Sequence, residues 1–124
     1  GLKDKDLIDK SLQLVNMESY KNSLIGNLSG GQQQKIFISR ALMGDPELII
    51  MDEPSTGVDV HSQKEIYNVI KELNLRKGIT VISVEHNLSA ALKYSTDILD
   101  LSSSHGLVSV KDYLKKFNEE NKYQ

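Results

Sequence analysis

The stretch that decides the fold is "LIIMDEPSTGVD", residues 48–59. Its first four residues, 48–51, form an apolar run of strand length, and we expect this strand to be buried on both faces. Asp52 and Glu53 follow immediately, and a proline and a glycine then mark a loop. Open α/β sheets bind ligands beyond the carboxyl ends of their strands, so the two acids lie where a ligand is expected.

The rest of the chain alternates between helical and strand patterns, which predicts the α/β class. A first helix, capped by Asp4 or Asp6, is expected before the glycine-rich stretch. Further helices are expected over residues 33–43, 62–76, 88–94 and 111–117, and further strands over residues 79–84, 98–101 and 107–110.

The composition narrows the class of protein. The 124 residues suffice for one domain or part of one, and 26% charged with 39% hydrophobic residues is typical of a globular chain. The net charge of -2 gives no basic surplus, so no nucleic-acid partner is expected. The absence of cysteine excludes disulfides and thiolate metal sites. No membrane span or signal peptide is visible, and the glycine at position 1 suggests a fragment.

Three polar residues at the predicted strand ends could carry chemistry. Asp52 can hold Mg²⁺, directly or through water, and Glu53 can orient or deprotonate a water; the alternative is a solvated acidic turn. His86 follows the strand 79–84 and can donate a hydrogen bond to a phosphate oxygen. The alternative for His86 is a surface or capping histidine, which is how we interpret His61 and His105.

A second glycine-rich stretch is "IGNLSGGQQQK", residues 25–35. The spacing of Gly26 and Gly31 fits G-x-x-x-x-G-K-[ST], but glutamines stand where the lysine and the hydroxyl residue belong. Ser29 is a candidate N-cap for the following helix, whose free N–H groups and dipole favour an anion without any lysine. The alternative is a plain capped helix with a flexible segment before it.

Taken in order, these segments resemble the second half of an ABC-transporter ATPase domain. "LSGGQ", "RAL", "LIIMDEP", "STGVD" and the histidine at position 86 look like that family's signature motif and following helix, Walker B strand, D-loop and switch histidine. The resemblance runs from about residue 26 to 86, and less specifically to 100. It implies a partial P-loop NTPase fold without the Walker A region, in which residues 1–46 belong to the helical subdomain and residues 47–124 carry the Walker B side.

The resemblance also implies roles toward a nucleotide. Ser29, Gly30 and Gly31 would contact the γ-phosphate of an ATP that a second subunit holds, and Gln32 would complete this motif. Asp59 would couple the two nucleotide sites across a dimer.

For the chemical step, the resemblance implies that Asp52 supports Mg²⁺ through water, that Glu53 is the general base, and that His86 binds the γ-phosphate. Glu85 stands where the family more often has serine or threonine, which adds a negative charge next to a phosphate contact.

The implied cofactors are ATP and Mg²⁺, and the implied partners are a second ATPase subunit in a head-to-tail dimer and transmembrane permease subunits. The implied location is cytoplasmic, peripheral on the cytoplasmic face of the cell membrane. No G-x-x-x-x-G-K-[ST] occurs in the 124 residues. We therefore expect that the chain alone neither binds ATP tightly nor hydrolyses it.

Residues 17–73 look most like importers of zinc or manganese, so the expected function is the ATP-hydrolysing subunit of a bacterial metal importer. Three alternatives stay open. They are a DNA-repair or chromosome-organising ATPase, a translation-associated ATPase without a membrane partner, and a non-catalytic binding module. The first of these carries long coiled coils beside the signature, and no heptad run exists here.

Overall fold

The computed structural model describes residues 1–122 and divides into two compact units, Gly1–Val84 and Glu85–Gln124. Within the described residues, no helix is long and apolar enough to cross a membrane.

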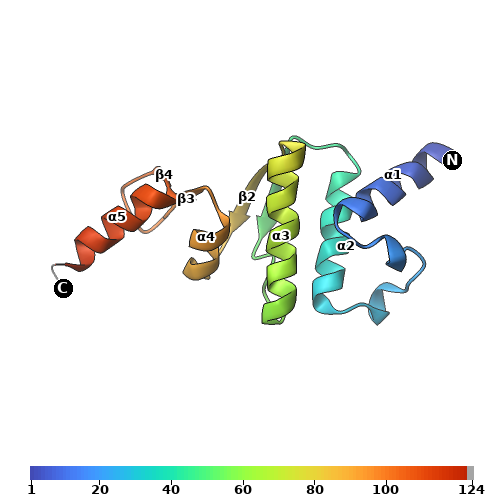
Figure 1. The fold of residues 1–124 in the computed structure, drawn as a ribbon, viewed down its shortest axis with the longest axis horizontal. Helices are drawn as coiled ribbons and strands as arrows, with labels where there is room; N and C mark the ends of the chain where they lie inside the picture. The colour runs from blue at the N-terminus through green and yellow to red at the C-terminus, as the bar shows by residue number, and fades with distance from the viewer. Residues whose placement is uncertain (123–124) are drawn as a thin grey trace. The chain divides into compact units, whose positions relative to one another are not determined.

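The first unit contains three long helices and a parallel strand pair (Figure 1). In chain order its elements are α1 (Leu2–Leu14), the short 3₁₀ turns η1 (Glu18–Tyr20) and η2 (Ile25–Asn27), α2 (Gly30–Leu42), β1 (Leu48–Asp52), α3 (Val60–Lys77) and β2 (Thr80–Val84).

The strands β1 and β2 pair in parallel, with Leu48 opposite Thr80 and Asp52 opposite Val84. The connection between them is α3, as the α/β pattern predicts. Along β1 burial alternates, and Ile50 is 69% exposed while its neighbours in the strand, Ile49 and Met51, are buried. The prediction of a strand buried on both faces is therefore wrong. Successive side chains point to opposite faces of the sheet, and α3 covers one of them.

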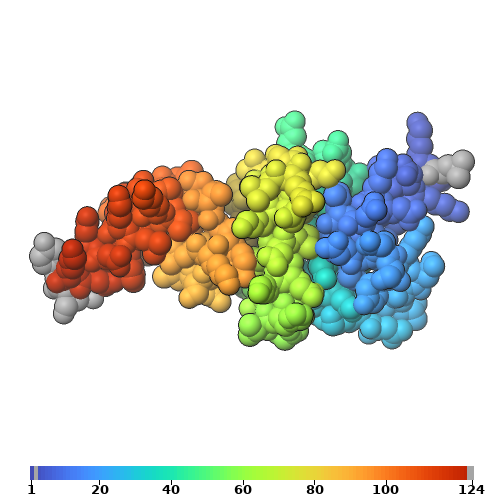
Figure 2. Space-filling view, viewed as in Figure 1, coloured from blue at the N-terminus to red at the C-terminus, as the bar shows by residue number. Residues whose placement is uncertain are grey.

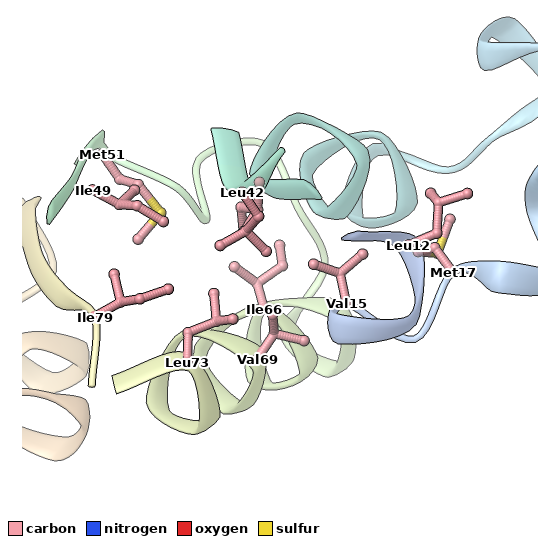
Figure 3. Close-up of a cluster of buried hydrophobic side chains, with 11 residues drawn as sticks. Leu12, Val15, Met17, Leu42, Ile49, Met51, Ile66, Val69, Leu73 and Ile79 are labelled. Atoms are coloured by element: carbon pink, nitrogen blue, oxygen red, sulfur yellow. The ribbon is translucent and has the colours of Figure 1, made fainter. Parts of the chain in front are cut away.

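The core of the first unit gathers around α3 (Figure 3). Ile66, Val69 and Leu73 form a buried stripe at helical spacing. Strand-side residues, including Met51 and Ile79, pack at one end of this cluster, and residues of α1, α2 and the turn after α1 pack at the other. On the face seen in Figure 2, the surface of the first unit is formed largely by α1, the turns that follow it and α3.

The starts of α1 and α2 differ most from the sequence-based expectation, while α3 and α5 begin two residues and one residue earlier than predicted. α1 begins at Leu2 with Gly1 at the N-cap position, so capping by Asp4 or Asp6 is wrong; Asp4 lies inside the first turn and accepts from the terminal amine. α2 begins at Gly30, three residues earlier than predicted, because Ser29 caps it there.

The second unit is a short helix followed by a hairpin and a final helix. α4 (Leu88–Tyr94) has the predicted bounds, and β3 (Asp97–Leu99) pairs antiparallel with β4 (Leu107–Ser109) before α5 (Val110–Asn121). Asp100 accepts hydrogen bonds from the backbone N–H and hydroxyl of Ser102 and from the Tyr113 hydroxyl, which ties the hairpin loop to α5. These bonds, the Ser102 hydroxyl first, lower the pKa of Asp100.

Two leucines of α3 offer a matched test of this packing. Leu73 is 2% exposed and Leu75 is 66% exposed. Leu73→Ala should lower the free energy of unfolding by about 2–5 kcal/mol, since it leaves a cavity, whereas Leu75→Ala should change it by less than about 1 kcal/mol. Chemical denaturation of both variants measures the difference, and equal losses would contradict the placement of α3.

Candidate functional site

The predicted cap of α2 is present and is reciprocal. The hydroxyl of Ser29 accepts from the backbone N–H of Gln32 at 3.2 Å, and the side-chain oxygen of Gln32 accepts from the backbone N–H of Ser29 at 2.9 Å. This capping box satisfies two backbone donors and lets the helix begin on two glycines. Residues 28–32 are called the glycine turn below.

A glutamine one position further on holds the approach to this turn. The side-chain amide of Gln33 donates to the carbonyls of Ile25 and Leu28, each at 3.1 Å. Leu28 also packs against the hydrophobic core. The start of α2 is therefore fixed by hydrogen bonds on one side and by packing on the other.

The acidic pair lies at the carboxyl end of β1. Asp52 is the last residue of the strand and is exposed, and Val84 ends the neighbouring strand beside it. Glu53 takes a left-handed backbone conformation with φ +49°. Such a conformation costs a residue with a side chain about 1–2 kcal/mol. Three hydrogen bonds hold it: the Glu53 N–H donates to the Val84 carbonyl, and the backbone N–H and hydroxyl of Thr56 donate to the Glu53 carbonyl and carboxylate.

The loop that follows the pair, residues 52–59, is called the acidic loop. Its middle is anchored by a buried hydrogen bond of 2.9 Å between the hydroxyls of Ser55 and Tyr67. Its end caps α3, because the Asp59 carboxylate accepts from the Ser62 N–H at 2.9 Å. The bonds from the Ser62 backbone and hydroxyl lower the pKa of Asp59, so the carboxylate stays charged to a lower pH than a free aspartate.

The amino-terminal starts of α2 and α3 are built alike. Gln63 lies four residues after its cap, as Gln33 does, and its amide donates to the carbonyls of Ser55 at 3.3 Å and Val58 at 2.8 Å. At each helix start the accepting carbonyls come one and four residues before the cap. Val58, like its counterpart before α2, packs against the core.

The starts of α2 and α3 also meet each other. A Cβ placed on Gly31 would lie 2.7 Å from the Ser62 Cβ and 3.5 Å from a Val58 methyl. The largely buried Lys35 ammonium pairs with the Glu65 carboxylate at 3.2 Å, one turn further along both helices. The glycine turn and the acidic loop are thus neighbours in space, although about twenty residues separate them in the sequence.

His86 lies in the bend between β2 and α4 and is exposed. It belongs to the second unit, whereas the acidic pair belongs to the first. Its neighbour Asn87 caps α4 by accepting from the Ala90 N–H. The role of His86 toward a phosphate stays a prediction. The other two histidines have carboxylate neighbours at the surface, with His61 3.4 Å from Glu65 and His105 3.0 Å from Glu120.

The donors at the strand end fit a magnesium ion that also binds phosphate. Mg²⁺ is bound through one or two carboxylates plus substrate phosphates and waters, and Asp52 and Glu53 supply adjacent carboxylates. In residues 1–122 no group of three or more histidine, aspartate or glutamate side chains could hold a metal without such help. An open hollow of about 250 Å³ lies elsewhere, between α1 and α2, and none of the predicted site residues lines it.

Sequence reasoning missed the residues that hold the site together. Gln33, Gln63 and Ser62 carry no charge and match no ligand-binding pattern. One signal was available: each glutamine comes four residues after a capping side chain and five after an apolar residue. That shared spacing marks a braced helix start.

Comparisons with known proteins identify the family of the chain. The ABC transporter family matches residues 3–56. The "Probable metal transport system ATP-binding protein" of Treponema pallidum is 47% identical over 114 residues, which cover 91% of this chain. The chain belongs to the ABC transporter ATPase family.

Further relatives in this ABC family carry named cargoes. The zinc uptake system ATP-binding protein ZurA of Listeria monocytogenes is 45% identical over 81% of this chain, and the manganese transport system ATP-binding protein MntB of Halalkalibacterium halodurans is 46% identical over 82%. The chain spans between 39% and 48% of the length of these relatives. It therefore corresponds to about half of an ABC ATP-binding protein or less.

Solved ABC cassettes share the fold. An ATP-binding cassette of an ABC transporter is 30% identical with a TM-score of 0.76, over 96% of this chain and 49% of that one. A dimeric cassette in a post-hydrolysis state, bound to ADP and Pi, is 28% identical with a TM-score of 0.70, over 89% of this chain and 48% of that one. The prediction of a partial ABC ATPase fold is confirmed.

The left-handed backbone of Glu53 restricts which residue types this position tolerates, and this restriction can be tested. Glu53→Val should be less stable than Glu53→Asn by about 1–2 kcal/mol, because asparagine tolerates a left-handed backbone and a β-branched residue does not. Chemical denaturation of the two variants measures the difference. Equal stabilities would contradict the positive φ of Glu53.

Proposed function

We propose that this chain is the signature and Walker B part of the ATP-hydrolysing subunit of an ABC importer. The observation that carries the proposal is the juxtaposition of the capped glycine turn and the acidic loop in a member of this family. Hydrolysis of a phosphoanhydride needs positioning and charge neutralisation more than covalent chemistry, and these two segments supply part of each.

In this proposal the acidic pair carries the chemical step. Asp52 would hold Mg²⁺ through water, and the bound ion would supply positive charge near the phosphates. Glu53 accepts a proton from the attacking water or orients it. Two backbone hydrogen bonds support this role, since they hold the Glu53 backbone where the strand ends: the Glu53 N–H donates to the Val84 carbonyl, and the Thr56 N–H donates to the Glu53 carbonyl. His86 donates a hydrogen bond to the γ-phosphate.

The glycine turn binds the γ-phosphate of a nucleotide that a second subunit holds through its Walker A loop. Ser29, Gly30, Gly31 and Gln32 bring the amino end of α2 to that phosphate, where the free N–H groups and the helix dipole favour negative charge. Asp59 couples the two sites of a head-to-tail dimer. The similarity to a dimeric cassette bound to ADP and Pi supports the dimer in this proposal.

The proposed cargo is a metal ion, zinc or manganese, since relatives at 45% and 46% identity are named for these metals. The proposed partners are a second ATPase subunit and transmembrane permease subunits, which places the protein on the cytoplasmic face of the cell membrane. Within the chain, residues 1–46 contribute to the helical subdomain and residues 47–124 to the Walker B side of the sheet.

The catalytic proposal is tested by Glu53→Gln in the full-length ATPase. Turnover of ATP should fall by about 100-fold or more, because the base is lost, while nucleotide binding is retained because the amide keeps the size of the side chain. Glu72→Gln is the matched control, since Glu72 is an exposed carboxylate on α3 paired with Arg76 and should leave turnover unchanged. Phosphate release measures both, and unchanged turnover in Glu53→Gln would remove Glu53 from the reaction.

A second test concerns the 124-residue chain by itself. Calorimetric titration with Mg-ATP should give no low-micromolar binding, because the loop that grips the phosphates belongs to the other half of the cassette. The full-length protein, which contains that loop under this proposal, is the positive control. Tight binding by the chain alone would contradict the composite site.

A further inference from the structure

Gly31 of the glycine turn lies directly against the first turn of α3, next to the end of the acidic loop. A Cβ at this position would lie 2.7 Å from the Cβ and 3.2 Å from the hydroxyl of Ser62. A separation of 2.7 Å is well inside van der Waals contact, so only glycine fits against Ser62 as the helices stand. Gly31 is buried, in agreement with this contact.

The neighbouring glycine does not share this constraint. A Cβ on Gly30 would meet only the Gly57 carbonyl, at an ordinary contact distance of 3.8 Å. The two adjacent glycines therefore differ in what they do within the chain. Gly30 leaves the amino end of α2 open, whereas Gly31 lets α2 pack directly against the first turn of α3.

The surroundings of the contact are braced on both sides. The amide of Gln33 fixes the approach to the glycine turn, and that of Gln63 fixes the end of the acidic loop. The Lys35–Glu65 ion pair, with the lysine side chain 11% exposed, joins the same two helices one turn away. Each glutamine thus holds its own helix start, and a displacement of one start against the other would break the ion pair. The contact at Gly31 and this ion pair together set the spacing of the two helix starts.

We propose that the close packing of Gly31 on Ser62 joins the glycine turn and the acidic loop into one rigid element, with Ser62 as the positioning residue. Ser29 and Asp59 then approach the neighbouring subunit together, and a displacement of one displaces the other. This inference rests on the proposed function, because it assigns a purpose to the contact within ATP turnover.

The test measures the cost of Gly31→Ala in three backgrounds of the full-length ATPase: wild type, Ser62→Ala and Ser62→Gly. Ser62→Ala removes the hydroxyl and keeps the Cβ, whereas Ser62→Gly removes both. In wild type and in Ser62→Ala, Gly31→Ala should lower kcat by about 10- to 100-fold, with a much smaller change in KM, since a displaced group slows the reaction even where binding persists. In Ser62→Gly most of this cost should disappear.

The loss of kcat caused by Gly31→Ala, compared across the three backgrounds, shows whether the effect passes through Ser62. An equal loss of kcat in all three backgrounds would overturn the proposal, because the effect would then not pass through Ser62. Recovery in Ser62→Ala as well would overturn it too, because the hydroxyl rather than the packing would be responsible. If Gly31→Ala fails to fold, the comparison of Ser62→Gly with Ser62→Ala in the presence of Gly31 replaces it. The glycine variant should then turn over several-fold more slowly, and equal rates would overturn the proposal.

Thermal unfolding of the same proteins separates this inference from the proposed function. Gly31→Ala should lower the unfolding midpoint in wild type and in Ser62→Ala, although alanine is the better helix former, and not in Ser62→Gly. Should the wild type lack ATPase activity while this unfolding pattern holds, the proposed function and the positioning role are refuted and the contact is supported. If Gly31→Ala changes the unfolding midpoint by the same amount in all three backgrounds, the contact between Gly31 and Ser62 is itself refuted.

Discussion

The first unit depends on the apolar stripe of α3. Ile66 and Leu73 are almost fully buried between the strand pair on one side and α2 on the other. A strand pair alone is marginal in water and needs a packed helix for stability. The acidic loop is bound to the same helix through Ser55 and Tyr67 and through the cap at Asp59. Both the acidic loop and the glycine turn are therefore positioned by their contacts with α3.

Strain at Glu53 fits this dependence. A left-handed backbone at a residue with a side chain persists only where its surroundings over-determine it, and such outliers cluster at functional sites. Here the carbonyl of Val84 and two donors of Thr56 impose the conformation. The backbone of Glu53 therefore leaves the strand conformation, and its carboxylate does not follow the alternating side-chain directions of β1. A relaxed backbone would continue the strand and change the direction of that side chain.

Much of this fold could be predicted from the sequence, because periodicity and cap residues mark its elements. The bounds of α4 agree with the prediction, and Ser29 caps α2 as expected. The predicted start of α2 is too late because two glycines are typical helix breakers, whereas the capping box and the packing of Gly31 keep them helical. The exposure of one face of β1 could not be predicted. An apolar run identifies a strand, but it does not show whether other elements of the chain pack on one face of the sheet or on both.

The candidate site divides in the same way. Its charged residues and glycines were predicted from the sequence, because carboxylates and glycine-rich turns are residue types that commonly bind metal ions and phosphates. Its supports were not predicted: the positive φ of Glu53 leaves no mark in residue type, and the contact between Gly31 and Ser62 depends on the crossing of two helices. Long-range geometry of this kind is set by packing, which a local pattern does not contain.

The paired glutamine braces have a consequence for the conditions under which the turns keep their shape. Amide-to-carbonyl hydrogen bonds neither titrate nor weaken through ionic screening, in contrast to the Lys35–Glu65 pair. The glutamine contacts at the starts of α2 and α3 therefore tolerate changes in salt and acidity, whereas the cap of α3 also depends on the charge of the Asp59 carboxylate. A response of the protein to ionic strength would arise in its long-range attraction of charged ligands and partners, and the local shape of either turn would stay the same.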